Sequence, residues 1–371
     1  MTIIFSILIL LVAIHVMRKC ASSFDIAASY LTRNLGEGIK GPTINAVASS
    51  LPELLISSMF LFYFKDIKGF SAGYGTIIGS SAFNIALIPV ISFVYLYITK
   101  GKEKVFQINK RIVKQDALFL LGSISILSLG FFIGVNFYLA LLLILFYFVY
   151  IFYVFKTRVD KKDKKFIKNH NLKLSDKIIH VESGSFLSSL FNFKLFRIFF
   201  KGNVTPLTST LVLLISVCII GGSCYLLVLA TENISHILGI NLFFGAFIIA
   251  AIASSIPDTI FSIQDAKNDK FIDSFSNAYG SNIFDICIGI GLPVLVYSSI
   301  YGPINMNMPI ERIGWIGDSV LGGNLFMWSL LILFFFTALV SLVYYKRNLT
   351  LKSAVLIFLL YLSFIITLLI F

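Results

Sequence analysis

Long apolar runs recur along nearly the whole chain, and they leave few folds open to it. A helix needs about 20 mostly apolar residues to cross a bilayer. Hydrophobic residues make up 58% of the chain and charged residues 13%, which excludes an ordinary globular domain. Barrel strands alternate apolar and polar residues, so the continuous runs exclude a membrane barrel. We expect membrane-spanning helices near residues 2–22, 36–64, 70–98, 116–135, 137–155, 206–230, 239–266, 271–300, 323–345 and 351–371.

The ten predicted spans divide into two halves around one long polar connector. Residues 1–155 carry five spans, residues 156–205 form the connector, and residues 206–371 carry five more. Because five is an odd number, the second half enters the membrane from the opposite side. The predicted fold is an all-α membrane protein with ten transmembrane helices in two inverted-topology five-helix repeats.

Most of the net charge of +12 lies in this connector, which has twelve lysines and arginines between Lys156 and Lys201. Basic loops stay on the cytoplasmic side, so we expect both chain termini outside a multi-pass protein of the cell membrane. A lysine-rich connector between membrane halves is an orientation signal, and we expect no nucleic-acid partner. The lipid bilayer is the expected partner, and no obligate protein partner is inferred.

Each half carries the same pair of polar motifs inside apolar sequence. The first motif reads Ser-Ser-Leu-Pro-Glu at residues 49–53 and Ser-Ser-Ile-Pro-Asp at residues 254–258. The second reads Gly-Ser-Ser-Ala-Phe-Asn at residues 79–84 and Gly-Ser-Asn-Ile-Phe-Asp at residues 280–285. A carboxylate at membrane depth costs about 2.5–3.5 kcal/mol, so a retained one marks a functional site. Acids in matching positions of two repeats predict a cation site at the repeat interface.

Helical spacing places the polar residues of each motif on one face. In the first motif of each half, the residues at i, i+3, i+4 and i+7 share a face. They are Ala46, Ser49, Ser50 and Glu53, and then Ala251, Ser254, Ser255 and Asp258. The second motifs add the stripes Thr76, Ser80 and Asn84, and Asn277, Ser281 and Asp285. Such oxygen ligands suit hard cations such as Na⁺, K⁺ and Ca²⁺.

Two simpler explanations compete with a cation site. Small-residue stripes also pack transmembrane helices, which explains Ser49 or Ser254 equally well when each is taken alone. Buried acids also pair with lysine or arginine, but no basic residue lies in the central part of a predicted span. We therefore expect Glu53, Asp258 and Asp285 to meet cations from solution.

Proline is expected to break both motif helices. Pro52 and Pro257 have no backbone N–H, which frees the carbonyls of Ala48 and Ala253 and kinks each helix. Irregular backbone at membrane depth is tolerated where it lines a cavity or a site. We expect nearby carbonyls to turn towards an ion.

The motifs resemble those of the cation/calcium antiporter superfamily, in particular its sodium/calcium exchanger family. The two motif pairs look like that family's repeats, over about residues 37–98 and 239–300. The second repeat is most similar to potassium-dependent sodium/calcium exchangers. Two departures are the alanines at Ala48 and Ala253, where the family often has glycine, and Asp258, where many members have glutamate.

The resemblance implies a site and an activity. Glu53 and Asp258 become the central Ca²⁺ carboxylates, and Asn84 and Asp285 complete the ring of ligands. Ser80 and Ser281 lie beside Asn84 and Asp285. The hydroxyl ligands of flanking Na⁺ sites are Ser49, Ser50, Ser254 and Ser255, and backbone carbonyls come from Ala46 and Ala251. The implied activity is secondary antiport of Na⁺ against Ca²⁺ by alternating access, with K⁺ co-transport left open and no cofactor.

Charge counting gives this activity a physical basis. Three Na⁺ would neutralise three carboxylates, as would one Ca²⁺ with one K⁺. Without cations, the unpaired carboxylates would penalise the change between the inward-facing and outward-facing states. The alternative is a proton-coupled exchanger of Ca²⁺ or another divalent cation. A channel is a further alternative. An intramembrane hydrolase is disfavoured, because neither Gly-x-Gly-Asp nor His-Glu-x-x-His is present, so we expect no enzyme.

Overall fold

The structure is a computed structural model, and it describes residues 2–33, 39, 41–101, 108–158, 184–306, 309–310 and 320–370. Within these residues, nine helices are long and apolar enough to cross a membrane, and a bent pair of helices makes a tenth span. Five spans precede residues 159–183 and five follow them. The predicted fold, an all-α membrane protein with two inverted five-helix halves, is confirmed.

In the first half, regular helices alternate with one interrupted span. Its elements are α1 (Ile3–Leu31), the π-helical turn η1 (Gly41–Asn45), α2 (Ala46–Ser49), α3 (Leu51–Phe64), α4 (Ile67–Lys100), α5 (Lys110–Ser128), α6 (Gly130–Ile133) and α7 (Phe137–Arg158). Because hydrocarbon offers the backbone no hydrogen bonds, the apolar runs form helices. Polar side chains begin two of them: Asp66 caps α4 through the N–H of Lys68, and Asn109 caps α5 through that of Arg111.

The second half repeats this order with more interruptions. The connector before it carries α9 (Phe186–Phe191) and α10 (Leu195–Phe200). The elements of the second half are α11 (Pro206–Leu238), α12 (Leu242–Gly245), η2 (Ala246–Ala250), α13 (Ala251–Ser254), α14 (Ile256–Lys267), α15 (Phe271–Phe284), η3 (Asp285–Ile290), α16 (Gly291–Tyr301), β1 (Pro309–Ile310), β2 (Val320–Leu321), α17 (Gly322–Lys346) and α18 (Leu351–Ile370). Thr205 and Thr208 form a capping box at the start of α11.

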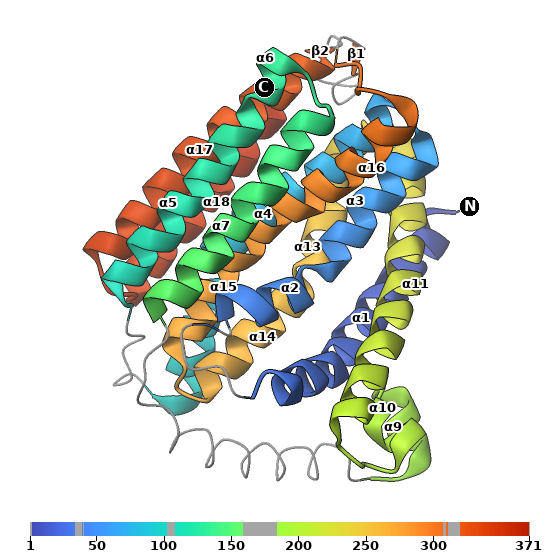
Figure 1. The fold of residues 1–371 in the computed structure, drawn as a ribbon, viewed down its shortest axis with the longest axis vertical. Coiled ribbons are helices and arrows are strands. Elements are labelled where there is room, and N and C mark those ends of the chain that lie inside the picture. The colour runs from blue at the N-terminus through green and yellow to red at the C-terminus, as the bar shows by residue number, and fades with distance from the viewer. Residues whose placement is uncertain are drawn as a thin grey trace.

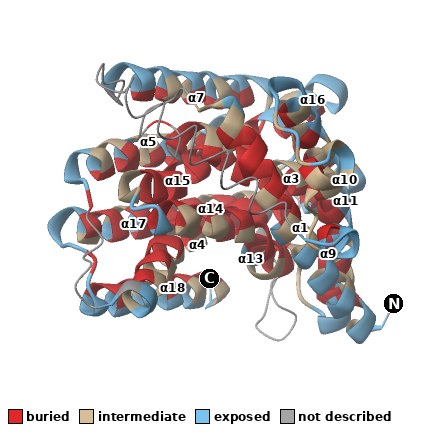
Figure 2. Ribbon diagram, turned by 90° about the horizontal axis from the view of Figure 1, so that it is seen from below, coloured by how far each residue is buried: buried red, intermediate tan, exposed pale blue. Residues whose placement is uncertain are grey.

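The motif helices lie in the centre of the bundle. Figure 2 shows α4, α14 and α15 mostly buried, while α7 and α18 expose their outer faces at the periphery. The helices α1 and α11 pack against each other along their length at one side (Figure 1). The motif residues are therefore enclosed by other helices rather than facing lipid.

Two spans are longer than predicted. α1 continues to Leu31 and α11 to Leu238, where the prediction ended at residues 22 and 230. Two charged residues in the C-terminal half of α1, Lys19 and Asp25, have polar partners. Lys19 Nζ donates to Asn192 Oδ1 at 2.6 Å, and Asp25 accepts from Ser29 Oγ at 3.1 Å.

The polar connector contains structure that periodicity did not indicate. Residues 159–183, with many of its lysines, lie outside the described residues, but α9 and α10 follow them. Ser23 Oγ of α1 donates to the carbonyl of Phe193 at 2.6 Å and accepts from the N–H of Leu195 at 3.2 Å, which fixes this helix pair on α1. The short antiparallel pair β1–β2 was also unpredicted.

Candidate cation-binding site

Both motif helices break immediately before the proline. α2 ends at Ser49 and α3 begins at Leu51, with a bend of 44° between the two parts of this span. In the second half, α13 and α14 meet at Ser255, but the span Leu242–Lys267 is one helix that is not bent to this extent. The expected kink is present in the first half, and the second half shows only an interruption of the regular helix at Ser255. As a result Glu53 and Asp258 each lie in the first turn of a new helix, where the helix dipole favours a negative charge.

A wide helical turn precedes the break in each half. The π-helical segments η1 and η2 lead directly into α2 and α13. Such turns hold one residue more than an α-helical turn and are frequent at functional sites. The two halves therefore share the same sequence of wide turn, short helix, break and acid.

Close crossings of the helices explain the motif glycines. A Cβ at Gly79 of α4 would overlap the carbonyl oxygen of Phe247 in η2. A Cβ at Gly280 of α15 would lie 2.6 Å from Cα of Pro42 in η1. Each second motif thus packs against the wide turn of the opposite half, which brings the four polar stripes together.

Glu53 is joined to the second half through one serine. Ser80 Oγ donates to Glu53 Oε1 at 3.1 Å, and the hydroxyls of Ser80 and Ser255 lie 3.0 Å apart. Asn84 Nδ2 donates to Ser80 Oγ at 3.3 Å. Glu53, Ser80 and Asn84 come from the first half and Ser255 from the second, so this network crosses the repeat interface.

Asp258 receives hydrogen bonds from both halves. Ser281 Oγ donates to Asp258 Oδ1 at 2.5 Å, and Asn84 Nδ2 donates to Oδ2 at 3.1 Å. Ser49 Oγ also donates to Oδ1 and lies 3.3 Å from Ser281 Oγ. Seven of the predicted site residues therefore form one continuous network: Ser49, Glu53, Ser80, Asn84, Ser255, Asp258 and Ser281.

Three predicted residues lie beside this network and make weaker contacts. Both carboxylate oxygens of Asp285 and the hydroxyl of Ser50 are buried and make no hydrogen bond of normal geometry, but Ser50 is close enough to Asp285, and Ser254 to Glu53, for the two groups to interact. Ser254 Oγ donates to the carbonyl of Ala251 at 3.2 Å. Asp285 is close enough to Glu53 and Asp258 for their charges to interact.

The two predicted backbone ligands keep their helical hydrogen bonds. The carbonyl of Ala46 accepts from the N–H of Ser50 at 3.0 Å, and that of Ala251 accepts from the N–H of Ser255 at 3.1 Å. Both carbonyls therefore still point along the helix, and the expected turn towards an ion is not seen. Their role as ligands stays a prediction.

The chemistry of the site is that of a hard-cation centre. Glu53, Asp258 and Asp285 are fully buried, and within the described residues none is bonded to a lysine or arginine. Glu53 Oε2, Asn84 Oδ1 and both oxygens of Asp285 lack a donor. No three acidic, histidine or cysteine side chains of the described part converge as one metal cluster. Hydroxyl and amide oxygens have to complete any cation shell.

Other buried polar residues were not predicted. Asp116 of α5 is fully buried and accepts from Ser276 Oγ of α15 at 3.0 Å and from the Tyr150 hydroxyl at 3.5 Å. Asn45 Nδ2 donates to Asp265 Oδ2 at 2.9 Å. An acid at the start of the predicted span 116–135 was a usable signal for Asp116. The contact between Asn45 and Asp265 joins residues 220 positions apart and had none.

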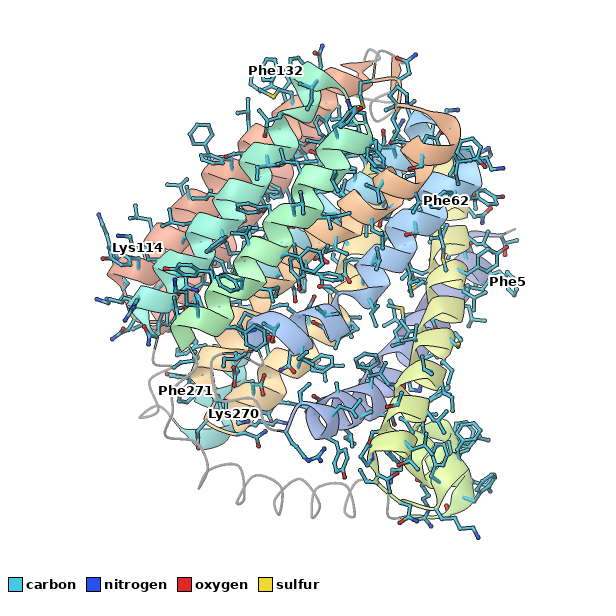
Figure 3. The ribbon with its side chains drawn as sticks, viewed as in Figure 1. Phe5, Phe62, Lys114, Phe132, Lys270 and Phe271 are labelled. Carbon is cyan, nitrogen blue, oxygen red and sulfur yellow. The ribbon has the colours of Figure 1, made fainter. Side chains whose placement is uncertain are left out.

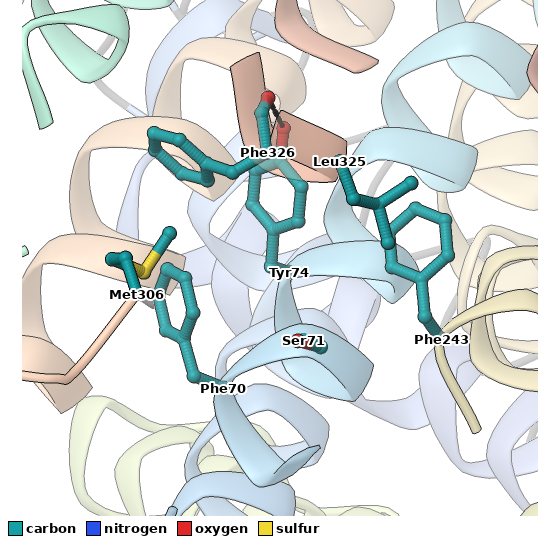
Figure 4. Close-up of a pocket in the computed structure, with 7 residues that line it drawn as sticks. All are labelled: Phe70, Ser71, Tyr74, Phe243, Met306, Leu325 and Phe326. Atoms are coloured by element: carbon teal, nitrogen blue, oxygen red, sulfur yellow. Dashed lines mark hydrogen bonds between the residues drawn. The ribbon is translucent and has the colours of Figure 1, made fainter. Parts of the chain in front are cut away.

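A small pocket lies elsewhere, among α4, α12 and α17. It is lined mainly by aromatic and aliphatic side chains: Phe70, Ser71, Tyr74, Phe243, Met306, Leu325 and Phe326 (Figure 4). The Tyr74 hydroxyl points at the carbonyl of Phe326 at 3.1 Å. This lining contains no carboxylate, so the pocket is not a second cation site.

The comparisons with known proteins agree with this geometry. A family model described as sodium/calcium exchanger protein matches residues 4–156 and 208–370. Sodium/potassium/calcium exchanger 2 of Homo sapiens is 36% identical over 77 residues, 21% of this chain and 12% of that protein. Sodium/potassium/calcium exchanger Nckx30C of Drosophila melanogaster is 41% identical over 58 residues, 15% and 7% of the two chains. The matches therefore span a small part of these curated relatives.

Solved exchanger structures share the fold over almost the whole chain. The sodium-calcium exchanger NCX_Mj aligns over 99% of both chains with a TM-score of 0.59 and 17% identity. The H⁺/Ca²⁺ exchanger CAX aligns over 99% of this chain and 84% of its own, with a TM-score of 0.64 and 15% identity. Because the family model covers most of the sequence, the chain belongs to the sodium/calcium exchanger protein family.

Proposed function

We propose that the chain is a secondary antiporter that exchanges Na⁺ for Ca²⁺ by alternating access. The observation that carries the proposal is the buried network across the repeat interface, because one carboxylate oxygen of Glu53 within it and both oxygens of Asp285 beside it have no hydrogen-bond donor of normal geometry. Burying an unpaired carboxylate is costly, and a hard cation would remove that cost. Family membership supports the same function.

The proposed ligands are the residues that the sequence predicted. Glu53 and Asp258 hold Ca²⁺, with Asn84 and Asp285 beside them. Na⁺ is held by the surrounding hydroxyls and carbonyls of Ser49, Ser50, Ser254, Ser255, Ser80, Ser281, Ala46 and Ala251. Charge balance sets the exchange: three Na⁺, or one Ca²⁺ with one K⁺, neutralise three carboxylates. The loaded bundle then rearranges easily, and the empty one does not.

The sidedness of the protein is part of the proposal. Residues 156–205 face the cytoplasm, and both termini lie outside the cell membrane, with Ca²⁺ moved outward. The positive-inside rule supports this orientation. The halves at residues 1–155 and 206–371 act as the two inverted units, with the lipid bilayer and the transported cations as partners.

A proton-coupled Ca²⁺ exchanger is the second candidate. The structural likeness to the H⁺/Ca²⁺ exchanger CAX favours it, and buried carboxylates are able to exchange a cation for protons. The hydroxyls of Ser49, Ser80, Ser255 and Ser281 favour Na⁺, because a hydroxyl ligates this ion without titrating.

Ion replacement in proteoliposomes separates the two candidates. Purified protein is reconstituted, loaded with ⁴⁵Ca²⁺, and given a gradient of Na⁺, K⁺ or H⁺ one at a time. A Na⁺ gradient that drives Ca²⁺ flux, abolished by Glu53→Gln, is expected. Flux driven by a pH gradient without Na⁺ selects the second candidate, and flux that survives Glu53→Gln overturns the site.

A further inference from the structure

A second line of buried polar residues leads away from Asp258 along α14. Asp258, Ser262 and Asp265 are spaced i, i+4 and i+7, which places them on one face of the helix. Ser262 is fully buried and Asp265 is 6% exposed. The line runs towards the turn before Lys270 and Phe271, both labelled at the lower edge of Figure 3. This is the end of the bundle that carries α9 and α10, here called the connector end.

Side chains from two other elements join this line. Asn277 Nδ2 of α15 donates to Ser262 Oγ at 3.2 Å and to the carbonyl of Asp258 at 3.4 Å. Asn45 Nδ2 of η1 donates to Asp265 Oδ2 at 2.9 Å. Ser49 Oγ of the central network donates to the carbonyl of Asn45 at 2.7 Å, so hydrogen bonds connect the central network to Asp265 through Asn45.

The side-chain amides of Asn45 and Asn277 each have a buried carbonyl oxygen that accepts no hydrogen bond. Asn45 Oδ1 and Asn277 Oδ1 have no hydrogen-bond partner, and the two residues are 1% and 0% exposed. Leaving such an oxygen unsatisfied costs about 1–3 kcal/mol. Amide and carboxylate oxygens are ligands of hard cations, and a few such ligands with water form a weak, hydrated site.

The repeat symmetry shows that this line exists at one end only. The motif acids Glu53 and Asp258 are 205 positions apart, so the counterparts of Asn45 and Asp265 are Ala250 and Phe60. Ala250 and Phe60 are apolar and fully buried. The counterpart of Ser262 is Ser57, whose hydroxyl donates to the carbonyl of Gly289 at 2.6 Å. The opposite end therefore lacks counterparts of both the acid Asp265 and the amide Asn45.

We propose that Asn45, Asp265 and Asn277 form a staging site for a partly hydrated cation, between the central network and the connector end. The proposal rests on the proposed function, because the cation is the one that the exchanger carries. Asp265 supplies the charge and the two amide oxygens supply neutral ligands. Since the opposite end has Ala250 and Phe60 instead, the staging site concentrates the cation at one membrane face alone.

The test measures cation dependence separately from each face. In a Cys218→Ser background, Ser188→Cys places a thiol on exposed α9, and an impermeant biotin–maleimide sorts proteoliposomes by orientation. Initial rates of Na⁺-driven ⁴⁵Ca²⁺ uptake are then recorded against Ca²⁺ concentration for each population. The variants are Asp265→Asn, which keeps the shape, and Asn45→Ala, which installs the residue of the symmetry-related position. Glu232→Gln, near the opposite end of α11, is the matched control for loss of one acid.

The expected result is a one-sided change. Asp265→Asn raises the half-saturating Ca²⁺ concentration at the connector face by on the order of tenfold, because a charged vestibule concentrates its ion, and Asn45→Ala raises it in the same direction. The half-saturating Ca²⁺ concentration at the opposite face stays unchanged in both variants, and Glu232→Gln changes it at neither face. An equal shift at both faces, or no shift in either variant, overturns the staging site. Failure of the proposed function is distinct, since it appears as absence of Na⁺-driven flux before any substitution here.

Discussion

Asn84 of α4 donates a hydrogen bond of 3.1 Å to Asp258 of α14, so a side chain of the first repeat directly contacts the acid of the second. The same Nδ2 atom also lies 3.3 Å from Ser80 Oγ, which in turn bonds Glu53. The two acids are therefore linked by hydrogen bonds through two residues of α4.

Neutralising Asp258 is expected to abolish exchange while leaving the bundle folded. Asp258→Asn removes one charge from a buried ion pair between carboxylate and cation, which costs about 3–5 kcal/mol, or at least about 100-fold in apparent Ca²⁺ affinity. Equilibrium ⁴⁵Ca²⁺ binding to purified protein measures the loss. Glu232→Gln should bind as the unmodified chain does, and unchanged binding by Asp258→Asn would remove this residue from the site.

Ser80 is expected to matter because it joins Glu53, Ser255 and Asn84. Ser80→Ala removes a hydroxyl that bonds a charged group, an interaction of about 1.5–3 kcal/mol, so the half-saturating Na⁺ concentration rises about 10- to 100-fold. The half-saturating Na⁺ concentration is measured by recording Ca²⁺ efflux over a range of Na⁺ concentrations. Ser125→Ala is the matched control, since that exposed hydroxyl bonds the carbonyl of Leu121 in its own helix. Equal behaviour of the two variants would contradict the role of Ser80.

Asp285 is expected to determine whether K⁺ takes part. With three carboxylates, one Ca²⁺ leaves one charge that K⁺ neutralises, whereas Asp285→Asn leaves two charges that Ca²⁺ balances alone. The variant should therefore exchange Ca²⁺ without the stimulation by K⁺ that three carboxylates predict for the unmodified chain. Flux at several K⁺ concentrations, with membrane voltage clamped by an ionophore, is the measurement. Stimulation that persists in the variant would place K⁺ elsewhere.

The close crossing at Gly79 is expected to tolerate no side chain. Gly79→Ala places a methyl against the backbone of Phe247, and overpacking of this kind costs about 1–3 kcal/mol in the free energy of unfolding. Thermal unfolding in detergent reports the loss. Gly222→Ala is the control, because nothing lies within 4 Å of the added Cβ. A Gly79→Ala protein as stable as the control would show that the helices have room to separate.

The sequence predicted the number of spans and the interruption of the motif helices, because each leaves a local pattern, whereas the role of the site residues as ligands stays a prediction. Apolar length indicates a span, and proline indicates a break. Periodicity placed Ser49 and Glu53 on one face of one helix. In the structure the helix is interrupted between them, and the Ser49 hydroxyl donates to Asp258 of the other half rather than to Glu53. Which acid a serine meets depends on how two distant helices cross, and spacing within one helix does not contain that information.

The same reason explains what was missed. The contact between Asn45 and Asp265 requires η1 to lie beside α14, and the docking of α9 and α10 requires Ser23 of α1 to meet the connector. The π-helical turn η3, which begins at Asp285, was also not predicted. Side-chain composition does not reveal a π-helical turn.

The wide turns η1 and η2 have a consequence for how such a chain tolerates insertions and deletions. Each holds one residue more than a regular turn, and the helix continues directly into the motif. Deleting a single residue from Gly41–Asn45 would tighten the turn and rotate everything before it by about 100° relative to Ser49. Homologous lineages are therefore expected to vary in sequence within these turns while conserving their length.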